Sequence, residues 1–292
     1  MKELILKGCG TALVTPFFED GTIDYEAYAA LVDRQVAEGV DFLVPIATTA
    51  ETPTLSMEER KQLLKLTVEH AAGHPVMPGV GTNSLEGTVA NIRMVEPFAP
   101  AALLVVVPYY NKPTQQGQYE YFKAVAESTE LPVFIYNVPG RTGANMQPDT
   151  CIRLANEVKN IAGIKEASGN YSQVSEIIRR APEGFAILSG DDDMTFAFMA
   201  TGAHGVISVA SNVAPAAVSE MVHCLQDEKI ARARELHHKL SPLFKACFVE
   251  SNPVPAKAAL SILGLCGDTM HLPLTSASDA TRELMGRVLS AL

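Results

Sequence analysis

The feature that most constrains this chain is a repeated alternation of short apolar runs with helical patterns. Eight runs rich in β-branched residues occur along the sequence, and a segment with helical periodicity follows each of them. Strands that alternate with helices at this spacing are typical of parallel βα units. The eight runs are Thr11–Thr15, Phe42–Ile46, Val76–Val80, Ala102–Val107, Val133–Asn137, Ile161–Lys165, Ala186–Ser189 and Gly205–Val209.

Eight such units in about 225 residues predict an α/β protein with a closed (β/α)8 TIM barrel. An open doubly wound sheet is the alternative, but no Gly-x-Gly-x-x-Gly follows the first strand. Helix starts are predicted at four polar residues, of which the second forms a capping box with Glu59. They are Asp24, Ser56, Asp149 and Ser172.

The strand pattern stops near residue 226. We therefore expect a catalytic barrel over residues 1–226 and a C-terminal helical region, for assembly or packing, over residues 227–292. Its predicted helices are Asp227–Phe248, with a kink at Pro242, then Pro255–Leu263 and Ser276–Leu292.

Charge and composition exclude several classes of protein. The net charge is −10 and the longest basic cluster is Arg179-Arg180, which argues against binding to nucleic acid or to an anionic membrane. The N-terminus carries Lys2, Glu3 and Lys7 with no apolar signal segment, and the longest apolar run is too short to span a bilayer. The five cysteines show neither metal nor disulfide spacing. We expect a cytoplasmic protein.

Residues 160–170 contain the most informative side chain. They form a short apolar strand that ends in Lys165 and then breaks at a Ser-Gly-Asn turn. Burial disfavours the ammonium, and the neutral amine can attack a ketone to give a Schiff base. The alternative is a structural lysine that reaches the barrel rim or pairs with Glu166.

In a barrel of this kind, the carboxyl ends of the strands form the site. Hydroxyl, amine and guanidinium groups that suit carbonyl chemistry follow the predicted strands. They belong to Thr48, Thr49, Tyr109, Tyr110, Tyr136, Arg141, Lys165 and Ser189. The threonines could instead cap a helix, the paired tyrosines could be core aromatics, and the Asp191–Asp193 run is typical of a helix cap rather than a metal site. No His, Cys and carboxylate cluster has metal-ligand spacing, so no metal is expected.

These residues stand in motifs that resemble the dihydrodipicolinate synthase family, within the pyruvate-dependent class I aldolases. The resemblance runs nearly end to end, and several motifs occur in order. They are 10–17 (GTALVTPF), 107–113 (VPYYNKP), 136–143 (YNVPGRTG), 163–167 (GIKEA), 188–192 (LSGDD) and 204–208 (HGVIS).

The resemblance implies an imine between Lys165 and pyruvate, with no other cofactor, and condensation with aspartate 4-semialdehyde on the route to lysine and diaminopimelate. Tyr136 is similar to the proton-relay tyrosine, linked to Thr48 and to Tyr110 of a neighbouring subunit. Thr49 resembles the residue that holds the pyruvate carboxylate, and Arg141 the one that holds the semialdehyde carboxylate. The resemblance also implies that the backbone around Gly190 and Ile207 lines the pocket. A homo-oligomer, a tetramer built as a dimer of dimers, is implied.

Two departures from the family pattern bear on the site. Ala47 and Ala50 replace glycines, which would strain the loop if either position needed a positive φ. Asn83 and Tyr109 match the family's allosteric lysine site, but Gly87 stands at its acidic position, so we expect weak or absent lysine inhibition. The rival functions are a sister aldolase on a sugar-derived keto acid, such as N-acetylneuraminate or 2-keto-3-deoxygluconate, and a non-catalytic barrel that binds a keto acid.

Overall fold

The computed structural model describes residues 6–292, so Lys2 and Glu3, used in the prediction of no signal peptide, lie outside it. The described chain forms two compact units. The first contains Pro75–Ile207 with residues 6–7, and the second contains Gly8–His74 and Ser208–Leu292. Each unit combines parallel strands with helices. Among the described residues, no helix is both long enough and apolar enough to cross a membrane.

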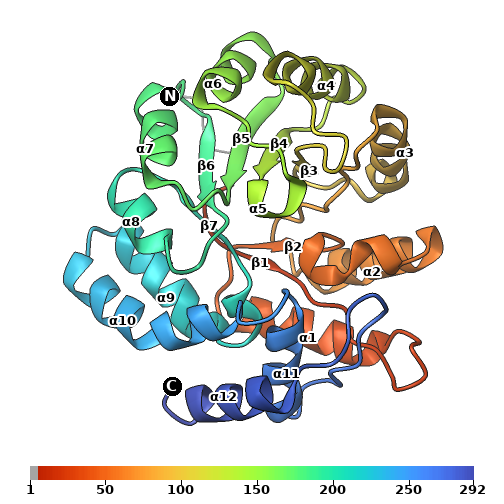
Figure 1. Cartoon of the computed structure of the whole chain (residues 1–292), viewed down its shortest axis with the longest axis vertical. Coiled ribbons are helices and arrows are strands. Elements are labelled where there is room, and N and C mark those ends of the chain that lie inside the picture. The colour runs from red at the N-terminus through yellow and green to blue at the C-terminus, as the bar shows by residue number, and fades with distance from the viewer. Residues whose placement is uncertain (1–5) are drawn as a thin grey trace. The chain divides into compact units, whose positions relative to one another are not determined.

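The first unit is a five-stranded parallel sheet with the order β7-β6-β5-β4-β3. Figure 1 shows helices α3, α4, α6 and α7 arranged along the outer side of these strands. The strands are β3 (Leu103–Val106), β4 (Val133–Asn137), β5 (Ile161–Glu166), β6 (Ala186–Ser189) and β7 (Gly205–Ser208). The helices are α3 (Leu85–Val95), α4 (Gln115–Glu127), α5 (Pro139–Thr142), α6 (Pro148–Glu157), α7 (Tyr171–Arg180) and α8 (Thr195–Ala200), with the 3-10 turn η3 (Glu96–Phe98). Almost every strand residue is buried, as expected for a parallel sheet.

The second unit pairs two parallel strands, β1 (Gly8–Ala12) and β2 (Phe42–Val44). Its helices are α1 (Tyr25–Ala37), α2 (Met57–His70), α9 (Pro215–Gln226), α10 (Ile230–Ala246), α11 (Val254–Ile262) and α12 (Asp279–Leu289). Three 3-10 turns complete it: η1 (Thr48–Ala50), η2 (Thr52–Thr54) and η4 (Ala210–Asn212). The predicted C-terminal helices are confirmed, and Pro242 lies inside α10. The division of the chain at residue 226 stays a prediction.

The predicted third strand, Val76–Val80, was wrong as a regular strand. Only Gly79 forms a parallel bridge, to Leu104, although the Val80 N–H also donates to the Leu104 carbonyl at 2.9 Å. Pro78 lies within this run and has no N–H to donate, so it interrupts the ladder. The segment therefore follows β3 without becoming a full strand.

The predicted first strand, Thr11–Thr15, was placed too late in the sequence, because β1 spans Gly8–Ala12. Its glycines hid it, since glycine is depleted in strands. Packing explains one of them: a Cβ on Gly10 would lie 2.1 Å from an edge carbon of the Phe42 ring. Gly10 therefore stands where the neighbouring strand supplies the aromatic side chain. The Val133–Asn137 and Ala186–Ser189 predictions match β4 and β6.

Two of the four predicted helix starts are confirmed. The Asp24 carboxylate accepts the Ala27 N–H at 2.9 Å, and Ser56 and Glu59 form the full capping box. The other two were wrong. Helix α6 has Gln147 as its N-cap, and α7 has Asn170, whose side chain accepts the Gln173 N–H at 3.1 Å. Asn170 caps the helix in place of Ser172, because its side chain accepts a backbone N–H of the first turn that has no partner within the helix.

Candidate active site

Lys165 occupies the carboxyl end of β5 and is only 5% exposed. Its neighbour across the sheet is Tyr136, because the parallel register of β4 and β5 places these two residues opposite each other. The Lys165 Nζ lies 4.3 Å from the centroid of the Tyr136 ring. Side chains at adjacent register positions of parallel strands point to the same face of the sheet. The two central residues of the predicted site are therefore brought together.

Gly190 leaves the space that the Lys165 side chain occupies. A Cβ at position 190 would lie 3.0 Å from Lys165 Cε and 2.6 Å from Ala167 Cβ. Any side chain there would displace the amine, so glycine is required at this place by packing. Ile207, the other predicted lining residue, lies fully buried on β7.

Burial controls the protonation of the lysine. Loss of hydration lowers the pKa of Lys165 to about 8, and the nearby charge of Arg141 lowers it as well, whereas Asp191 and Asp192 act in the opposite direction. A lysine in water is charged almost completely at neutral pH. At this site a substantial fraction of the amine is neutral near pH 8, which is the form that adds to a carbonyl.

The acidic residues that follow β6 do not cap the next helix as the sequence pattern predicted. Helix α8 has Met194 as its N-cap with no side-chain capping bond, so the Asp191–Asp193 run does not cap it. Asp191 instead interacts electrostatically with Lys165, and burial raises the pKa of its carboxyl to about 6. The Ser-Gly-Asp-Asp sequence at the end of a strand was the signal for this role. The site thus includes a carboxylate beside the amine.

Glu166 anchors the site from the opposite face of the same strand. It is fully buried and accepts hydrogen bonds from Asn137 Nδ2 (3.1 and 3.2 Å), Gln173 Nε2 (3.0 Å) and the Ser168 N–H (2.9 Å). Burial raises the pKa of Glu166, while these donors oppose the rise. Asn137 also donates to Asn145 Oδ1 at 2.8 Å. This network, which the sequence did not reveal, fixes β5 to β4 and to the loop that follows β4.

Arg141 lies in the short helix α5 that follows β4, and its side chain is exposed. The loop is joined to the turn that carries Tyr110, because the Tyr110 N–H donates to the Thr142 carbonyl at 3.4 Å. Gly143 has a φ of +69°, and a Cβ there would lie 2.9 Å from Lys112 Cε. The loop of Arg141 therefore packs against the turn that carries Tyr110 and Lys112. From this loop the charge of Arg141 acts on Lys165.

Tyr110 stands out by its backbone and its exposure. It has a φ of +70°, which bulky residues rarely adopt, and its side chain is 87% exposed. Tyr109 is 38% exposed, and Asn83 is tied to the same turn because its carbonyl accepts from Asn111 Nδ2 at 2.8 Å. The structure leaves the Tyr110 ring directed away from the body of its own unit. A strained, exposed aromatic of this kind is typical of a functional contact.

Thr48 and Thr49 belong to the second unit, in the turn η1 that follows β2. Thr49 is 2% exposed, and its hydroxyl accepts from Asn252 Nδ2 at 3.0 Å. Ala47 is extended, with a φ of −102°, and Ala50 is not among the residues with a positive φ. The two alanines therefore introduce no backbone strain. The left-handed positions of this loop are Ile46, with a φ of +46°, and Glu51, with a φ of +57°.

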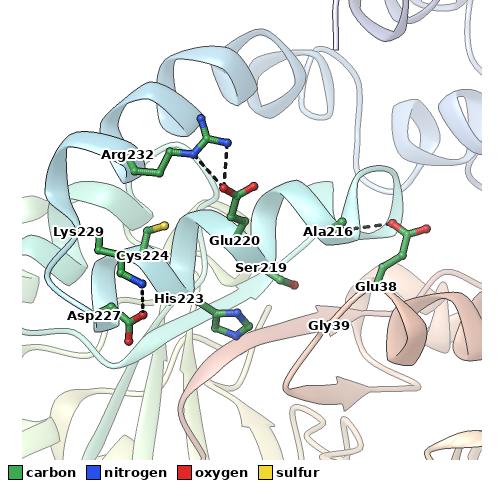
Figure 2. A pocket seen from close by; sticks show the side chains of 10 residues that line it. All are labelled: Glu38, Gly39, Ala216, Ser219, Glu220, His223, Cys224, Asp227, Lys229 and Arg232. Carbon is green, nitrogen blue, oxygen red and sulfur yellow. Dashed lines mark hydrogen bonds and ion pairs between the residues drawn. The ribbon is translucent and has the colours of Figure 1, made fainter.

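A surface cavity of about 490 Å³ lies on the second unit, and several of its charged lining residues form ion pairs. Figure 2 shows its lining, in which Glu220 pairs with Arg232 and Asp227 with Lys229. His223 is paired in turn with Asp41 at 2.8 Å. Glu38 and Gly39, also in the lining, precede β2, at the amino end of the strand. In a barrel, that end contributes to stability rather than to catalysis.

The described part of the first unit thus assembles a buried amine, a tyrosine ring, a carboxylate and a guanidinium around the end of β5. Within residues 6–292, no group of three or more His, Cys, Asp or Glu side chains is arranged to hold a metal ion. A neutral amine with an adjacent aromatic hydroxyl suits addition to a keto group followed by proton transfer. A parallel βα architecture with such a lysine at a strand end is typical of Schiff-base-forming enzymes.

The chain belongs to the dihydrodipicolinate synthetase family, whose model matches residues 5–292. A 4-hydroxy-tetrahydrodipicolinate synthase of Phocaeicola vulgatus is 46% identical, over 100% of this chain and 99% of that protein. The crystal structure of dihydrodipicolinate synthase from Thermotoga maritima superposes with a TM-score of 0.96 at 44% identity, covering 98% of each chain. A monomeric dihydrodipicolinate synthase variant gives 0.96 at 43% identity, over 98% of this chain and 97% of its own.

These likenesses confirm three predictions. The family inferred from the ordered motifs is the family to which the chain belongs. The fold class, a (β/α)8 barrel with C-terminal helices, is confirmed by the close match to solved structures of that family. The chain is an enzyme of the lyase class.

Proposed function

We propose that this enzyme condenses pyruvate with aspartate 4-semialdehyde to give 4-hydroxy-tetrahydrodipicolinate, for the synthesis of lysine and diaminopimelate. The relatives carry this activity in their names and match the chain over its whole length. The observation that carries the proposal is the buried Lys165 amine, with its pKa lowered to about 8, beside Tyr136. A protein that only binds keto acids has no need of such an amine.

The neutral amine of Lys165 adds to the C2 carbonyl of pyruvate, and loss of water gives the imine. The protonated imine then loses a proton from the methyl carbon and becomes an enamine. That carbon attacks the aldehyde carbon of the semialdehyde and forms the new carbon–carbon bond. The amino group of the adduct finally displaces Lys165 by transimination, which closes the ring and frees the enzyme. No cofactor besides the lysine is part of this scheme.

The remaining residues take the roles that the family pattern gives them. Tyr136, in register with Lys165, is the proton shuttle for water loss and for the enamine step. Arg141, on its exposed loop, binds the carboxylate of the incoming semialdehyde. Thr49 donates its hydroxyl to the pyruvate carboxylate, and Thr48 extends the proton relay. Asp191 is added to this set because its charge acts on the amine.

We propose that the enzyme works as a homo-oligomer in the cytoplasm, as a dimer of dimers. The exposed Tyr110, with its strained backbone, supports a contact with a neighbouring subunit. A monomeric variant exists among the similar structures, so the family fold does not by itself require assembly. Sedimentation of the protein with Tyr110→Ala as a comparison tests this directly. A monomer with full activity would contradict it.

The first experiment is borohydride trapping. The protein is incubated with pyruvate, reduced, digested and analysed by mass spectrometry. A reduced pyruvyl group on Lys165 is the expected result, and its absence in folded protein would contradict the mechanism. A panel of aldehydes then separates the synthase from a sister aldolase. Turnover that is fastest with a sugar-derived aldehyde would favour the latter, as would cleavage of N-acetylneuraminate or 2-keto-3-deoxygluconate.

A further inference from the structure

A buried ion pair supports the loop that carries Thr48 and Thr49. Glu51 comes directly after this turn, and its Oε1 lies 2.9 Å from the Nζ of Lys257 on α11. The two side chains are 1% and 0% exposed. A pair so completely removed from water is costly to form, so its geometry must be supported by further hydrogen bonds.

Those further bonds come from the C-terminal region. The second carboxylate oxygen of Glu51 accepts the His271 N–H at 3.0 Å, and Lys257 Nζ also donates to the Thr269 carbonyl at 2.5 Å. The same ammonium lies 4.2 Å from the centroid of the Phe17 ring. Glu51 thereby joins the loop after β2 to two segments that lie more than 200 residues later in the sequence.

A second link acts on Thr49 itself. Asn252 Nδ2 donates to the Thr49 hydroxyl oxygen at 3.0 Å, and both side chains are buried. A threonine hydroxyl has one proton to donate, and among the described residues the structure assigns this proton to no acceptor. Because the oxygen already accepts from Asn252, the hydroxyl proton is left for another acceptor, such as a carboxylate oxygen.

We propose that Glu51, Lys257 and Asn252 are positioning residues that hold the Thr49 hydroxyl in place to bind the carboxylate of the keto acid. This inference rests on the proposed function. In this arrangement the C-terminal helices do more than pack or assemble, because α11 and its flanking segments set the geometry of a substrate-binding loop. The ion pair fixes the end of the loop, and the amide fixes the direction of the hydroxyl.

The test compares Lys257→Met with the double variant Glu51→Gln/Lys257→Met. Lys257→Met leaves a buried carboxylate without its cation, so we expect a lower thermal midpoint and a pyruvate KM raised about tenfold, with kcat changed far less. The double variant removes both charges, so its thermal midpoint recovers. Its KM stays high if the pair positions the loop. Recovery of KM together with stability would overturn the proposal, because the pair would then act on stability alone.

Asn252→Ala tests the same idea without disturbing the ion pair. We expect a pyruvate KM raised about threefold or more, because the hydroxyl loses its orientation. An unchanged KM in this variant would contradict the proposed role of Asn252.

The matched control is Lys229→Met, which removes a lysine whose Nζ is also 2.9 Å from its carboxylate partner, but at an exposed place in the same unit. Its KM should equal that of the unmodified enzyme, and a rise like that of Lys257→Met would overturn the proposal. Borohydride trapping separates the two levels of inference. If the unmodified protein gives no pyruvyl adduct, the proposed function and this inference both fail. If it gives the adduct and the variants keep their KM, only the positioning role fails.

Discussion

Lys165 and Tyr136 face each other across adjacent parallel strands, with the lysine nitrogen 4.3 Å from the centroid of the tyrosine ring. The contact brings the amine next to an aromatic face, which attracts a cation, while burial disfavours the cation. Burial lowers the pKa of Lys165 to about 8, with Arg141 acting in the same direction and Asp191 and Asp192 opposing it. The tyrosine hydroxyl is carried on the same residue that shields the amine from water.

We expect kcat/KM for pyruvate to rise with pH and to level off above pH 8. The neutral amine is the reactive form, and with a pKa of about 8 it makes up about 10% of the lysine at pH 7 and about half at pH 8. The measurement is a pH profile of kcat/KM, with the rate of borohydride-trapped adduct as a second readout. A rise that continues unchanged to pH 10 would show that Lys165 has the pKa of an ordinary lysine.

Asp191→Asn should move this rising limb to lower pH. The Asp191 carboxylate raises the pKa of Lys165, so its removal lowers that pKa and increases the neutral fraction at pH 7. The effect should disappear below pH 6, where the Asp191 carboxyl, with a pKa of about 6, becomes protonated in the unmodified enzyme. Asp193→Asn is the control, because Asp193 is exposed and is not among the charges that act on Lys165. A limb that moves equally in both variants would refute the specific effect of Asp191.

Tyr136→Phe should lower kcat by roughly 10²- to 10⁴-fold, since it removes a proton-transfer group and leaves the ring in place. Thermal unfolding should show that the fold is retained. Tyr119→Phe serves as the control, because the Tyr119 hydroxyl donates to Glu157 at 2.7 Å away from the lysine. Turnover that is equally reduced in the two variants would mean that the Tyr136 hydroxyl has no part in the chemistry.

Arg141→Met should raise KM for aspartate semialdehyde and lower kcat/KM for it by about tenfold or more, because the carboxylate loses its guanidinium partner. Pyruvate trapping should be compared at pH 9. Arg141 lowers the pKa of Lys165, so its loss reduces the neutral amine at lower pH. Arg153→Met, which removes an exposed arginine paired with Glu157, is the matched control. A loss of pyruvate trapping at pH 9 would place Arg141 in the first half of the reaction instead.

Lysine should inhibit this enzyme weakly or not at all. The family resemblance matches Gly87 to the acidic position of lysine-sensitive members, and a Cβ at Gly87 would lie 2.9 Å from both Ser84 Oγ and Thr82 Oγ1. The first turn of α3 therefore leaves no room for a larger side chain at position 87 unless the Ser84 and Thr82 side chains move. A titration of activity against lysine measures the effect. Half-maximal inhibition below about 1 mM, an affinity of roughly 4 kcal/mol, would be evidence against this prediction.

The sequence predicted the elements whose local signals agree with their surroundings. The β4 run Val133–Asn137 is apolar and β-branched, and it is a buried strand with those bounds. Gly10 and Pro78 misled the prediction, because the reasons for them are tertiary: a ring from β2 covers Gly10, and Pro78 lies along β3. Strand identity there depends on neighbours that are distant in sequence.

The candidate site likewise contains residues that local sequence patterns predict and residues that they do not. Lys165 and Arg141 could be predicted because each ends a strand or follows one, where a barrel places its chemistry. Glu51 and Lys257 could not, since they are separated by 206 positions and no local pattern links them. The doubt about Ala47 was resolved only by the backbone, which is extended at this position. Backbone angles and long-range pairs are the two kinds of information that local patterns lack.

The arrangement of the two units along the chain sets an order for synthesis on the ribosome. Apart from its two described N-terminal residues, which are translated first, the unit that holds Lys165 is one continuous stretch. It is complete once Ile207 has emerged. The other unit starts earlier but needs the last part of the chain, including Asn252 and Lys257. The nascent enzyme therefore contains its reactive amine well before the loop of Thr49 has its supports. The supports of the substrate-binding loop are complete only after His271 has been translated.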